Sequence, residues 1–251
     1  MKKSNKKNSA AIVVIGNEIL SGRTQDVNVS FLANWLNEIG VRVGEVRIIE
    51  DQEWSIVSCI REIKKKYKYI FTTGGIGPTH DDITSKSIAK AFKLPYGYHK
   101  EAYEILEKYY KKEQFSEGRK KMAKLPKQAS LIYNPSSGAP GFIVENVFCL
   151  PGVPSILKSM VEGLTNKIAG GKKILSKTLS VNTVESEIAK SLESIQNKNK
   201  NIEIGSYPFF RLGKIGVSIV IRSTEKDKIE NCSKQILDFL RERNIKIMNR
   251  D

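Results

Sequence analysis

The stretch TTGGIGPTHDDIT, residues 72–84, decides the fold because it joins a short apolar strand, residues 69–72, to a helix expected over residues 84–92. An open α/β sheet binds its ligands at the carboxyl ends of its strands, where such a connection lies. Three glycines within four residues allow positive φ angles and let backbone N–H groups approach an anion at the start of a helix. The stretch therefore predicts a phosphate-binding loop. The expected contact residues are Thr73, Gly74, Gly75, Gly77, Pro78 and Thr79.

This loop matches neither of two common phosphate-binding motifs. No Gly-Lys-Ser/Thr follows it, as in a P-loop, and the third glycine of the dinucleotide fingerprint is missing. Asp81 and Asp82 would repel a lone anion, but they suit a divalent cation that bridges carboxylate and phosphate oxygens. One of them can instead cap the following helix. We expect catalytic and metal-binding roles for both, and we assign the chemistry first to Asp82.

Further acidic and polar residues are expected at the same edge of the sheet. Asn17 and Glu18 follow the first apolar run, residues 10–15, and Asp51 follows a strand expected over residues 41–49. The carboxyl ends of parallel strands share one edge, so these side chains should meet the glycine loop. Glu18 can instead be plain surface charge, and Asp51 a helix cap. Together they predict an acidic rim with Asn17 near the ligand. The expected metal ligands are Glu18, Asp51, Asp81 and Asp82.

Three other turns can contribute to the ligand site. Asp26 and Asn28 stand where a helix expected over residues 28–39 begins, and each can cap it or point into the site. The small-residue loop 136–141 can be a simple turn or can let a ligand approach closely. A Pro-Gly pair then breaks the chain after an expected strand, residues 141–150. The ligand contacts expected from these turns are Asp26, Asn28, Ser137, Gly138, Pro151 and Gly152.

The order of the apolar segments predicts two domains. Up to residue 169 strands and helices alternate, which is typical of right-handed βαβ units. After a Gly-Gly-Lys-Lys linker the order becomes strand, helix, strand, strand, helix, with bounds 175–181, 184–196, 202–210, 214–222 and 226–242. The sequence thus predicts an α/β domain with a mostly parallel sheet flanked by helices over residues 10–169. A small α+β two-layer sandwich is expected over residues 174–251, and a disordered basic tail over residues 1–9.

Composition argues against several classes of protein. The formal charge is +15, but the lysines are scattered and lack interleaved aromatics, so we expect no nucleic-acid partner. Cys59, Cys149 and Cys232 are too far apart in the sequence for a zinc cluster or a disulfide framework, and we expect them buried and reduced. His80 and His99, the only histidines, complete no nucleophile pattern. No apolar run approaches the roughly 18 residues of a spanning helix. We expect a cytoplasmic protein without a membrane partner.

Four loops together carry a family resemblance. They read Gly16-x-Glu18-Ile19-Leu20-x-Gly22, Thr73-Gly74-Gly75-x-Gly77-Pro78-x-x-Asp81-Asp82-x-Thr84, the loop of residues 134–142, and Leu150-Pro151-Gly152-x-Pro154. The set resembles the molybdopterin-binding-like domain of competence/damage-inducible protein A. It is more similar still to the N-terminal domain of eukaryotic FAD synthase, which shares the full run over residues 74–82. Gly205-Ser206-Tyr207-Pro208 in the second domain matches as well.

The resemblance implies a metal-dependent pyrophosphatase that hydrolyses the diphosphate of FAD, ADP-ribose or a similar dinucleotide. Cobalt, magnesium or manganese ions would assist, as would potassium, and the protein would be a homodimer or trimer. We expect the chain to lack the adenylyltransferase domain of FAD synthase, and so we do not expect it to synthesise FAD. The alternative is a non-hydrolytic protein that binds molybdopterin or a nucleotide in the same loop and serves molybdenum cofactor metabolism.

Overall fold

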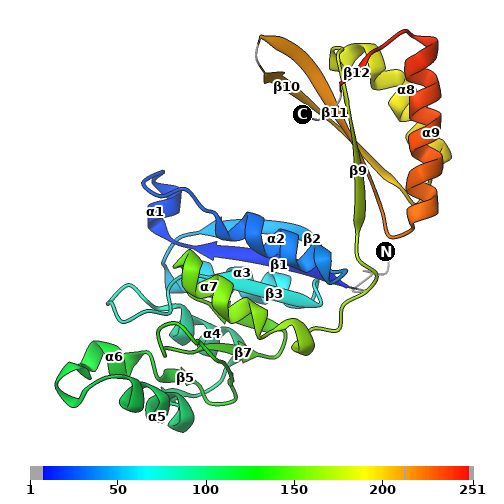
Figure 1. The fold of residues 1–251 in the computed structure, drawn as a ribbon. Helices are drawn as coiled ribbons and strands as arrows, with labels where there is room; N and C mark the ends of the chain where they lie inside the picture. The colour runs from blue at the N-terminus through cyan, green and yellow to red at the C-terminus, as the bar shows by residue number, and fades with distance from the viewer. Residues whose placement is uncertain (1–7, 212, 249–251) are drawn as a thin grey trace. The chain divides into compact units, whose positions relative to one another are not determined.

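The computed structural model describes residues 8–211 and 213–248. The chain divides into two compact units, residues 1–171 and 172–251 (Figure 1), and each is described by itself. The sequence placed this division in the linker 170–173. Most of the basic tail expected over residues 1–9 lies outside the described residues, and Ser9 already begins the first strand.

In its described residues, 8–171, the first unit contains eight strands. Their bounds are β1 Ser9–Ile15, β2 Arg42–Ile49, β3 Tyr69–Thr73, β4 Tyr96–Tyr98, β5 Lys124–Pro126, β6 Ser130–Ile132, β7 Gly141–Val144 and β8 Val147–Leu150. Its helices are α1 Asn17–Leu20, α2 Asn28–Glu38, α3 Glu53–Ile63, α4 Thr84–Phe92, α5 Lys100–Tyr109, α6 Glu117–Lys121 and α7 Pro154–Glu162, with 3-10 turns at Lys112–Gln114 and Thr165–Lys167.

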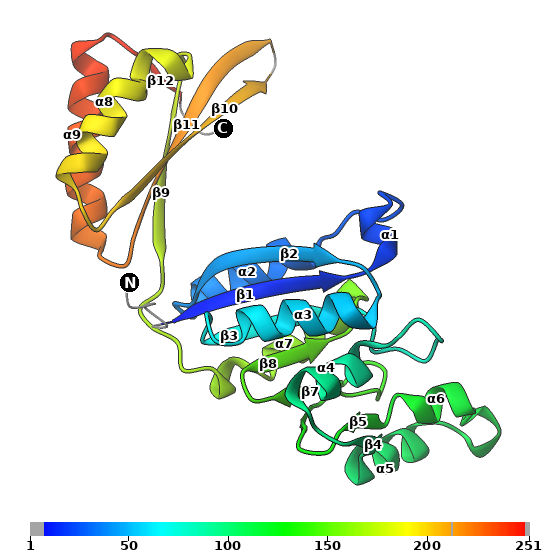
Figure 2. The same ribbon diagram turned by 180° about the vertical axis from the view of Figure 1, so that it is seen from behind.

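Six of these strands form one sheet in the order β2-β1-β3-β8-β7-β6. Strands β2, β1, β3 and β8 pair in parallel, and β7 runs antiparallel between β8 and β6, so the sheet is mixed but mostly parallel. Helices α2 and α7 cover one face of the sheet, and α3 and α4 cover the other (Figures 1 and 2), while α5 lies beside the β4–β5 hairpin and adds Ala102 and Leu106 to the core on the α3–α4 side. The apolar run of β1 packs into both cores, because its alternate side chains point to opposite faces.

The register of the sheet brings four strand ends to one level. Ile15 pairs with Ile49, and Thr73 pairs with both Val14 and Leu150. The connections that leave these four strands therefore start side by side at one edge of the sheet, where open α/β sheets bind their ligands.

One predicted strand proves to be a hairpin. The sequence indicated a single strand over residues 141–150, but β7 and β8 pair with each other and turn at Glu145, which has a φ of 51°. The apolar run on both sides of the turn hid this break. The small hairpin of β4 and β5 and the short helix α6 were also missed, since elements of three to five residues leave no periodic pattern.

The second unit is an antiparallel sheet covered by two helices. Its elements are β9 Leu175–Val181, α8 Glu185–Lys198, β10 Glu203–Arg211, β11 Lys214–Ser223, α9 Lys226–Glu242 and β12 Ile247–Met248. The sheet order is β10-β11-β9-β12, and both helices pack their apolar stripes on it. This is the predicted two-layer sandwich with one short added strand. None of the described helices, in either unit, has the length and apolar content to cross a bilayer.

Candidate functional site

The glycine loop leaves β3 as a tight turn that only glycine can form. Gly74 and Gly75 have φ angles of 106° and 68°. A Cβ on Gly74 would stand 2.1 Å from the Ile15 carbonyl oxygen, and one on Gly75 would stand 2.2 Å from Thr84 Oγ1. The Thr84 hydroxyl donates a hydrogen bond to the Gly74 carbonyl oxygen at 3.0 Å, and α4 begins at Thr84. The loop is therefore a short connection from a buried strand to a helix start. The Gly74 N–H donates to the Leu150 carbonyl oxygen at 3.1 Å, which ties the loop to the end of β8.

Asn28 ties this loop to a second one. Its Nδ2 donates to Thr73 Oγ1 at 3.0 Å and to the Gly152 carbonyl oxygen at 2.8 Å. Thr73 Oγ1 in turn donates to the Pro151 carbonyl oxygen at 3.1 Å. Asn28 is only 4% exposed, and its Oδ1 finds no hydrogen-bond partner among the residues that the structure describes. The loops after β3 and β8 are thus held together by one buried amide.

The capping of α2 falls to Asp26. Asp26 Oδ1 accepts a hydrogen bond from the Val29 N–H at 2.8 Å, while Asn28 is buried in the loops. The sequence had left both roles open for each residue. Of the two, the structure brings Asn28 to the ligand loops and uses Asp26 at the start of the helix.

The two aspartates of the glycine loop turn back onto Thr79. Thr79 donates its N–H to Asp82 Oδ2 at 2.7 Å, and its hydroxyl lies 2.5 Å from Asp82 Oδ2 and 2.6 Å from Asp81 Oδ1. A Cβ on Gly77 would stand 2.8 Å from Asp82 Oδ2, so Gly77 permits this turn. Of the two roles that the sequence left open for these aspartates, capping of α4 is not found, because the residue before that helix is Ile83 and no side chain caps it.

Asp51 and Asn17 pair across the ends of β1 and β2. Asp51 Oδ2 accepts the Asn17 N–H at 2.8 Å, and Asn17 Oδ1 accepts the Asp51 N–H at 3.4 Å. Asp51 does not cap α3, whose preceding residue is Gln52. The carboxylate of Glu18 folds back over Gly16, where a Cβ would stand 2.6 Å from Glu18 Oε1.

The four predicted metal ligands share one electrostatic field. Burial raises the pKa of Asp51, the Asn17 hydrogen bond opposes this, and the negative charges of Glu18, Asp81 and Asp82 raise it further. Carboxylate oxygens are the donors that Mg²⁺ and similar hard cations prefer. Within residues 8–211 and 213–248, however, no three Asp, Glu, His or Cys side chains lie close enough to hold a metal ion. The donor chemistry fits a cation, whereas the spacing is that of a rim and not of a closed metal site.

A cavity of about 300 Å³ lies beside the glycine loop. Asn134 shapes its far wall, because Oδ1 accepts the N–H groups of Ser136 and Ser137 and Nδ2 donates to the Ala139 carbonyl oxygen. The lining residues are Ile76, Pro78, Tyr110, Arg119, Met122, Asn134, Ser137, Ala139, Pro140, Pro151 and Ile156. The structure thus brings the predicted residues Pro78, Ser137 and Pro151 to one cavity. Gly138 is turned away from it and packs on the Tyr109 ring.

Tyr110, Arg119 and Lys121 were missed by the sequence analysis. Lys121 donates a hydrogen bond to the Thr79 carbonyl oxygen, and Arg119 and Tyr110 line the cavity. The pattern Gly118-Arg119-Lys120-Lys121 was visible in the sequence, but it looked like one of several exposed basic runs.

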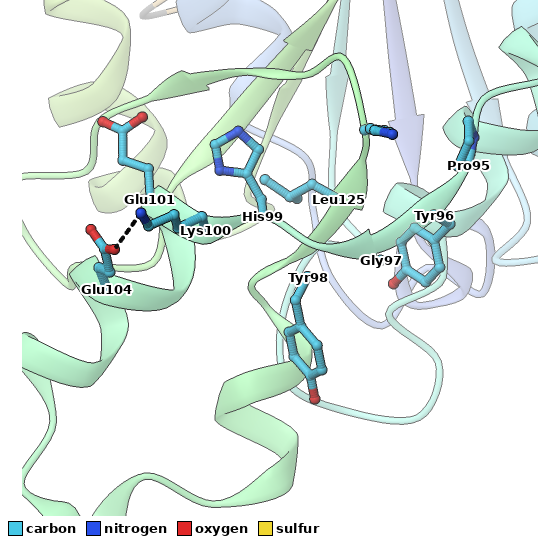
Figure 3. A pocket seen from close by; sticks show the side chains of 10 residues that line it. Pro95, Tyr96, Gly97, Tyr98, His99, Lys100, Glu101, Glu104 and Leu125 are labelled. Carbon is cyan, nitrogen blue, oxygen red and sulfur yellow. Dashed lines mark ion pairs between the residues drawn. The ribbon is translucent and has the colours of Figure 1, made fainter.

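A larger cavity of about 490 Å³ lies elsewhere, on the β4–β5 hairpin and the start of α5 (Figure 3). Its walls carry Tyr96, Tyr98 and Leu125, and Lys100 pairs with Glu104 at 4.0 Å. His99 caps α5 by accepting the Ala102 N–H at Nδ1. None of the predicted ligand or metal residues lines this cavity, so size alone does not mark the site.

Comparison with known proteins assigns both units to described domains. Residues 11–170 match the family "Probable molybdopterin binding domain", and residues 173–248 match "FAD synthase, middle domain". A protein of Archaeoglobus fulgidus is 33% identical over 92% of this chain and 98% of its own length. A protein of Saccharolobus islandicus is 35% identical, covering 96% of this chain and 97% of its own.

One solved structure supports the same fold. The protein CinA of unknown function from Thermoplasma acidophilum is 30% identical with a TM-score of 0.61, over 64% of this chain and 98% of its own. The resemblance inferred from the four loops is therefore confirmed, and so is the fold class.

Proposed function

The chain belongs to the probable molybdopterin binding domain family, and on that premise we propose that it is an enzyme that hydrolyses the diphosphate of FAD, ADP-ribose or a similar dinucleotide. The match of residues 173–248 to the middle domain of FAD synthase supports a nucleotide of the FAD type as the first substrate to test.

One observation carries this proposal: a glycine-rich backbone turn at the start of α4 adjoins a rim of carboxylates. The glycine turn suits a phosphate. The negative charges of Glu18, Asp81 and Asp82 help to raise the pKa of Asp51, so the four carboxylates lie near one another. Carboxylates beside a bound diphosphate repel it unless a cation lies between them. The combination supports a site for a diphosphate together with a divalent ion.

The chain's own residues would divide the work as follows. The backbone of the glycine loop after Gly74 would bind one phosphate. Asp81 and Asp82 would hold the cation, which is Co²⁺, Mg²⁺ or Mn²⁺ with K⁺ assisting, and Glu18 and Asp51 would add negative charge around it. When bound, such an ion lowers the pKa of a water molecule and neutralises charge that develops on the phosphate. Thr79 orients both aspartates through its N–H and hydroxyl. Asn28 keeps the two loops in register around the phosphate.

The test is a direct assay of products. The pure protein is incubated with FAD, ADP-ribose or NAD, with cobalt or magnesium and potassium, and the products are separated by chromatography. AMP together with FMN or ribose phosphate is the expected result. Asp82→Asn should lower the rate at least about 100-fold, the order seen when one group that stabilises a transition state is removed. Asp238→Asn, at an exposed position of α9 in the second unit, is the matched control and should leave the rate unchanged.

One observation favours a second candidate, a protein that binds molybdopterin or a nucleotide without hydrolysing it. Among the described residues no three carboxylates stand within reach of one metal ion. Measurable binding of a pterin or nucleotide with no product under any metal would support this candidate and refute the hydrolase.

We propose a cytoplasmic location and a homodimer or homotrimer, with a small nucleotide or pterin as the partner and neither a membrane nor a nucleic acid. Light scattering after gel filtration tests the subunit number. A mass equal to one chain would refute the oligomer.

A further inference from the structure

Helix α6 lies directly on the glycine loop. A Cβ on Gly118 would stand only 3.0 Å from the Pro78 carbonyl oxygen, so the two backbones touch there. Lys121 Nζ donates a hydrogen bond to the Thr79 carbonyl oxygen one residue further on. Two separate contacts therefore fix this short helix to the loop assigned to phosphate.

The Lys121 ammonium lies where the glycine loop meets the acidic rim. Its acceptor is the carbonyl oxygen of Thr79, the residue whose hydroxyl lies 2.6 Å from Asp81 Oδ1 and whose N–H donates to Asp82 Oδ2 at 2.7 Å. An ammonium group has three N–H donors. Within the described part of the chain one of them is used by Thr79, which leaves the others for a ligand.

Arg119 projects from the same helix into the cavity of about 300 Å³. Its guanidinium lies 4.2 Å from the centre of the Tyr110 ring, and its Nη1 donates to the Gln114 carbonyl oxygen at 2.5 Å. These two contacts hold the side chain in place and occupy one of its five N–H donors. The other lining residues are polar without charge or apolar, so Arg119 is the charged group of this cavity.

We propose that Arg119, from the cavity wall, and Lys121, from the Thr79 side of the loop, bind the second phosphate of a diphosphate whose first phosphate lies on the glycine loop at residues 75–77. The inference rests on the proposed function and names the part of the substrate that the site selects. A backbone turn of this size holds one phosphate. The Arg119 guanidinium and the Lys121 ammonium lie beside the loop, and both groups suit a second phosphate next to the first. The site should therefore prefer a diphosphate to a monophosphate.

Binding of two probes by isothermal titration tests the proposal. The probes are AMP and the α,β-methylene analogue of ADP, whose phosphates are joined by carbon and do not hydrolyse. Arg119→Gln and Lys121→Gln should each raise the dissociation constant of the analogue about tenfold, which equals about 1.4 kcal/mol. The same substitutions should raise the dissociation constant of AMP less than about twofold. Arg119→Lys should recover part of the loss, because it restores the charge without the fork.

Lys120→Gln is the matched control. Lys120 lies on the same helix and loses the same charge, but its Nζ pairs with Glu117 at 2.7 Å, whereas Lys121 donates to the glycine loop and Arg119 lines the cavity. An equal loss in Lys120→Gln, an equal loss for AMP, or no binding of the analogue by the unaltered protein would overturn the proposal. Urea unfolding of each variant excludes misfolding as the cause.

The experiments distinguish a failure of the proposed hydrolase activity from a failure of the proposed second phosphate site. Because the analogue cannot be hydrolysed, selective weakening by Arg119→Gln supports the second phosphate site even where no substrate is turned over. Turnover without any effect of either variant supports the hydrolase and refutes the phosphate site.

Discussion

Replacing Asn28 by alanine should destabilise the first unit by about 3 kcal/mol. The change removes the hydrogen bonds from Nδ2 to Thr73 and to the Gly152 carbonyl oxygen, each with a net contribution of about 1 kcal/mol. It also leaves the carbonyl oxygen of Gly152 without this partner, which costs about 1–3 kcal/mol where the group is buried. Removal of the unpaired Asn28 Oδ1 offsets part of the loss. The expected net loss in the free energy of unfolding is therefore about 2–4 kcal/mol.

Urea unfolding followed by tryptophan fluorescence measures this change in one unit alone. The two tryptophans, Trp35 and Trp54, both belong to the first unit, and Trp35 packs against the buried Phe71 ring at 5.8 Å. With a slope of about 2 kcal/mol per molar urea, the midpoint should fall by about 1.5 M.

The control for this prediction is Asn34→Ala. Asn34 is exposed on the same helix, so the substitution should raise stability slightly, by at most about 0.5 kcal/mol of helix propensity. If Asn28→Ala unfolds at the same urea concentration as Asn34→Ala, the buried amide does not hold the loops together and the reasoning is refuted.

Three further predictions concern the loops, the rim and the thiols. Gly75→Ala should weaken binding of the ADP analogue at least about tenfold, since the added Cβ meets Thr84 Oγ1. Gly22→Ala is the control, because Gly22 has a similar φ of 73° and its added Cβ would have no atom within 4 Å. It should leave binding unchanged in the same titration. The pKa of Asp51 is raised on folding, so its charge destabilises the fold as pH rises through that pKa. The Asp51→Asn variant should therefore unfold at a higher urea concentration than the unaltered protein at pH 7. The difference between the two urea midpoints should shrink toward pH 4, and a difference that does not change with pH would contradict this. Burial raises the pKa of Cys149 to about 12, so a disulfide reagent at pH 8 should label this thiol only after denaturation.

The sequence was sufficient for the parts of the site that depend on backbone conformation. Gly74 and Gly75 adopt positive φ where their spacing required it, and the parallel strand ends meet at one edge as the apolar runs indicated. The second unit follows its predicted order because its strands and helices are long enough to show their periods.

The parts that depend on long-range contacts could not be predicted. Whether Asp82 caps a helix or turns toward Thr79 depends on the course of the loop, and both outcomes satisfy local rules. Arg119 and Lys121 lie about forty residues beyond the glycine loop, on a helix of five residues, and only the fold shows that they meet it. Their lysine-rich surroundings made them resemble solvated surface.

The Asn28 side chain also has a consequence for the order in which the chain becomes native. It joins partners that are 45 and 124 residues away in the sequence, and Thr73 joins Pro151 over 78 residues. Contacts of such separation form only after large loops of chain have closed, and their entropy cost delays them relative to local helices. During synthesis the nascent chain can form α2 early, but the amide of Asn28 has no complete set of partners until Gly152 has left the ribosome. Ligand binding is therefore among the last properties that the first unit acquires, and a ligand added during refolding should report completion of the fold and not its beginning.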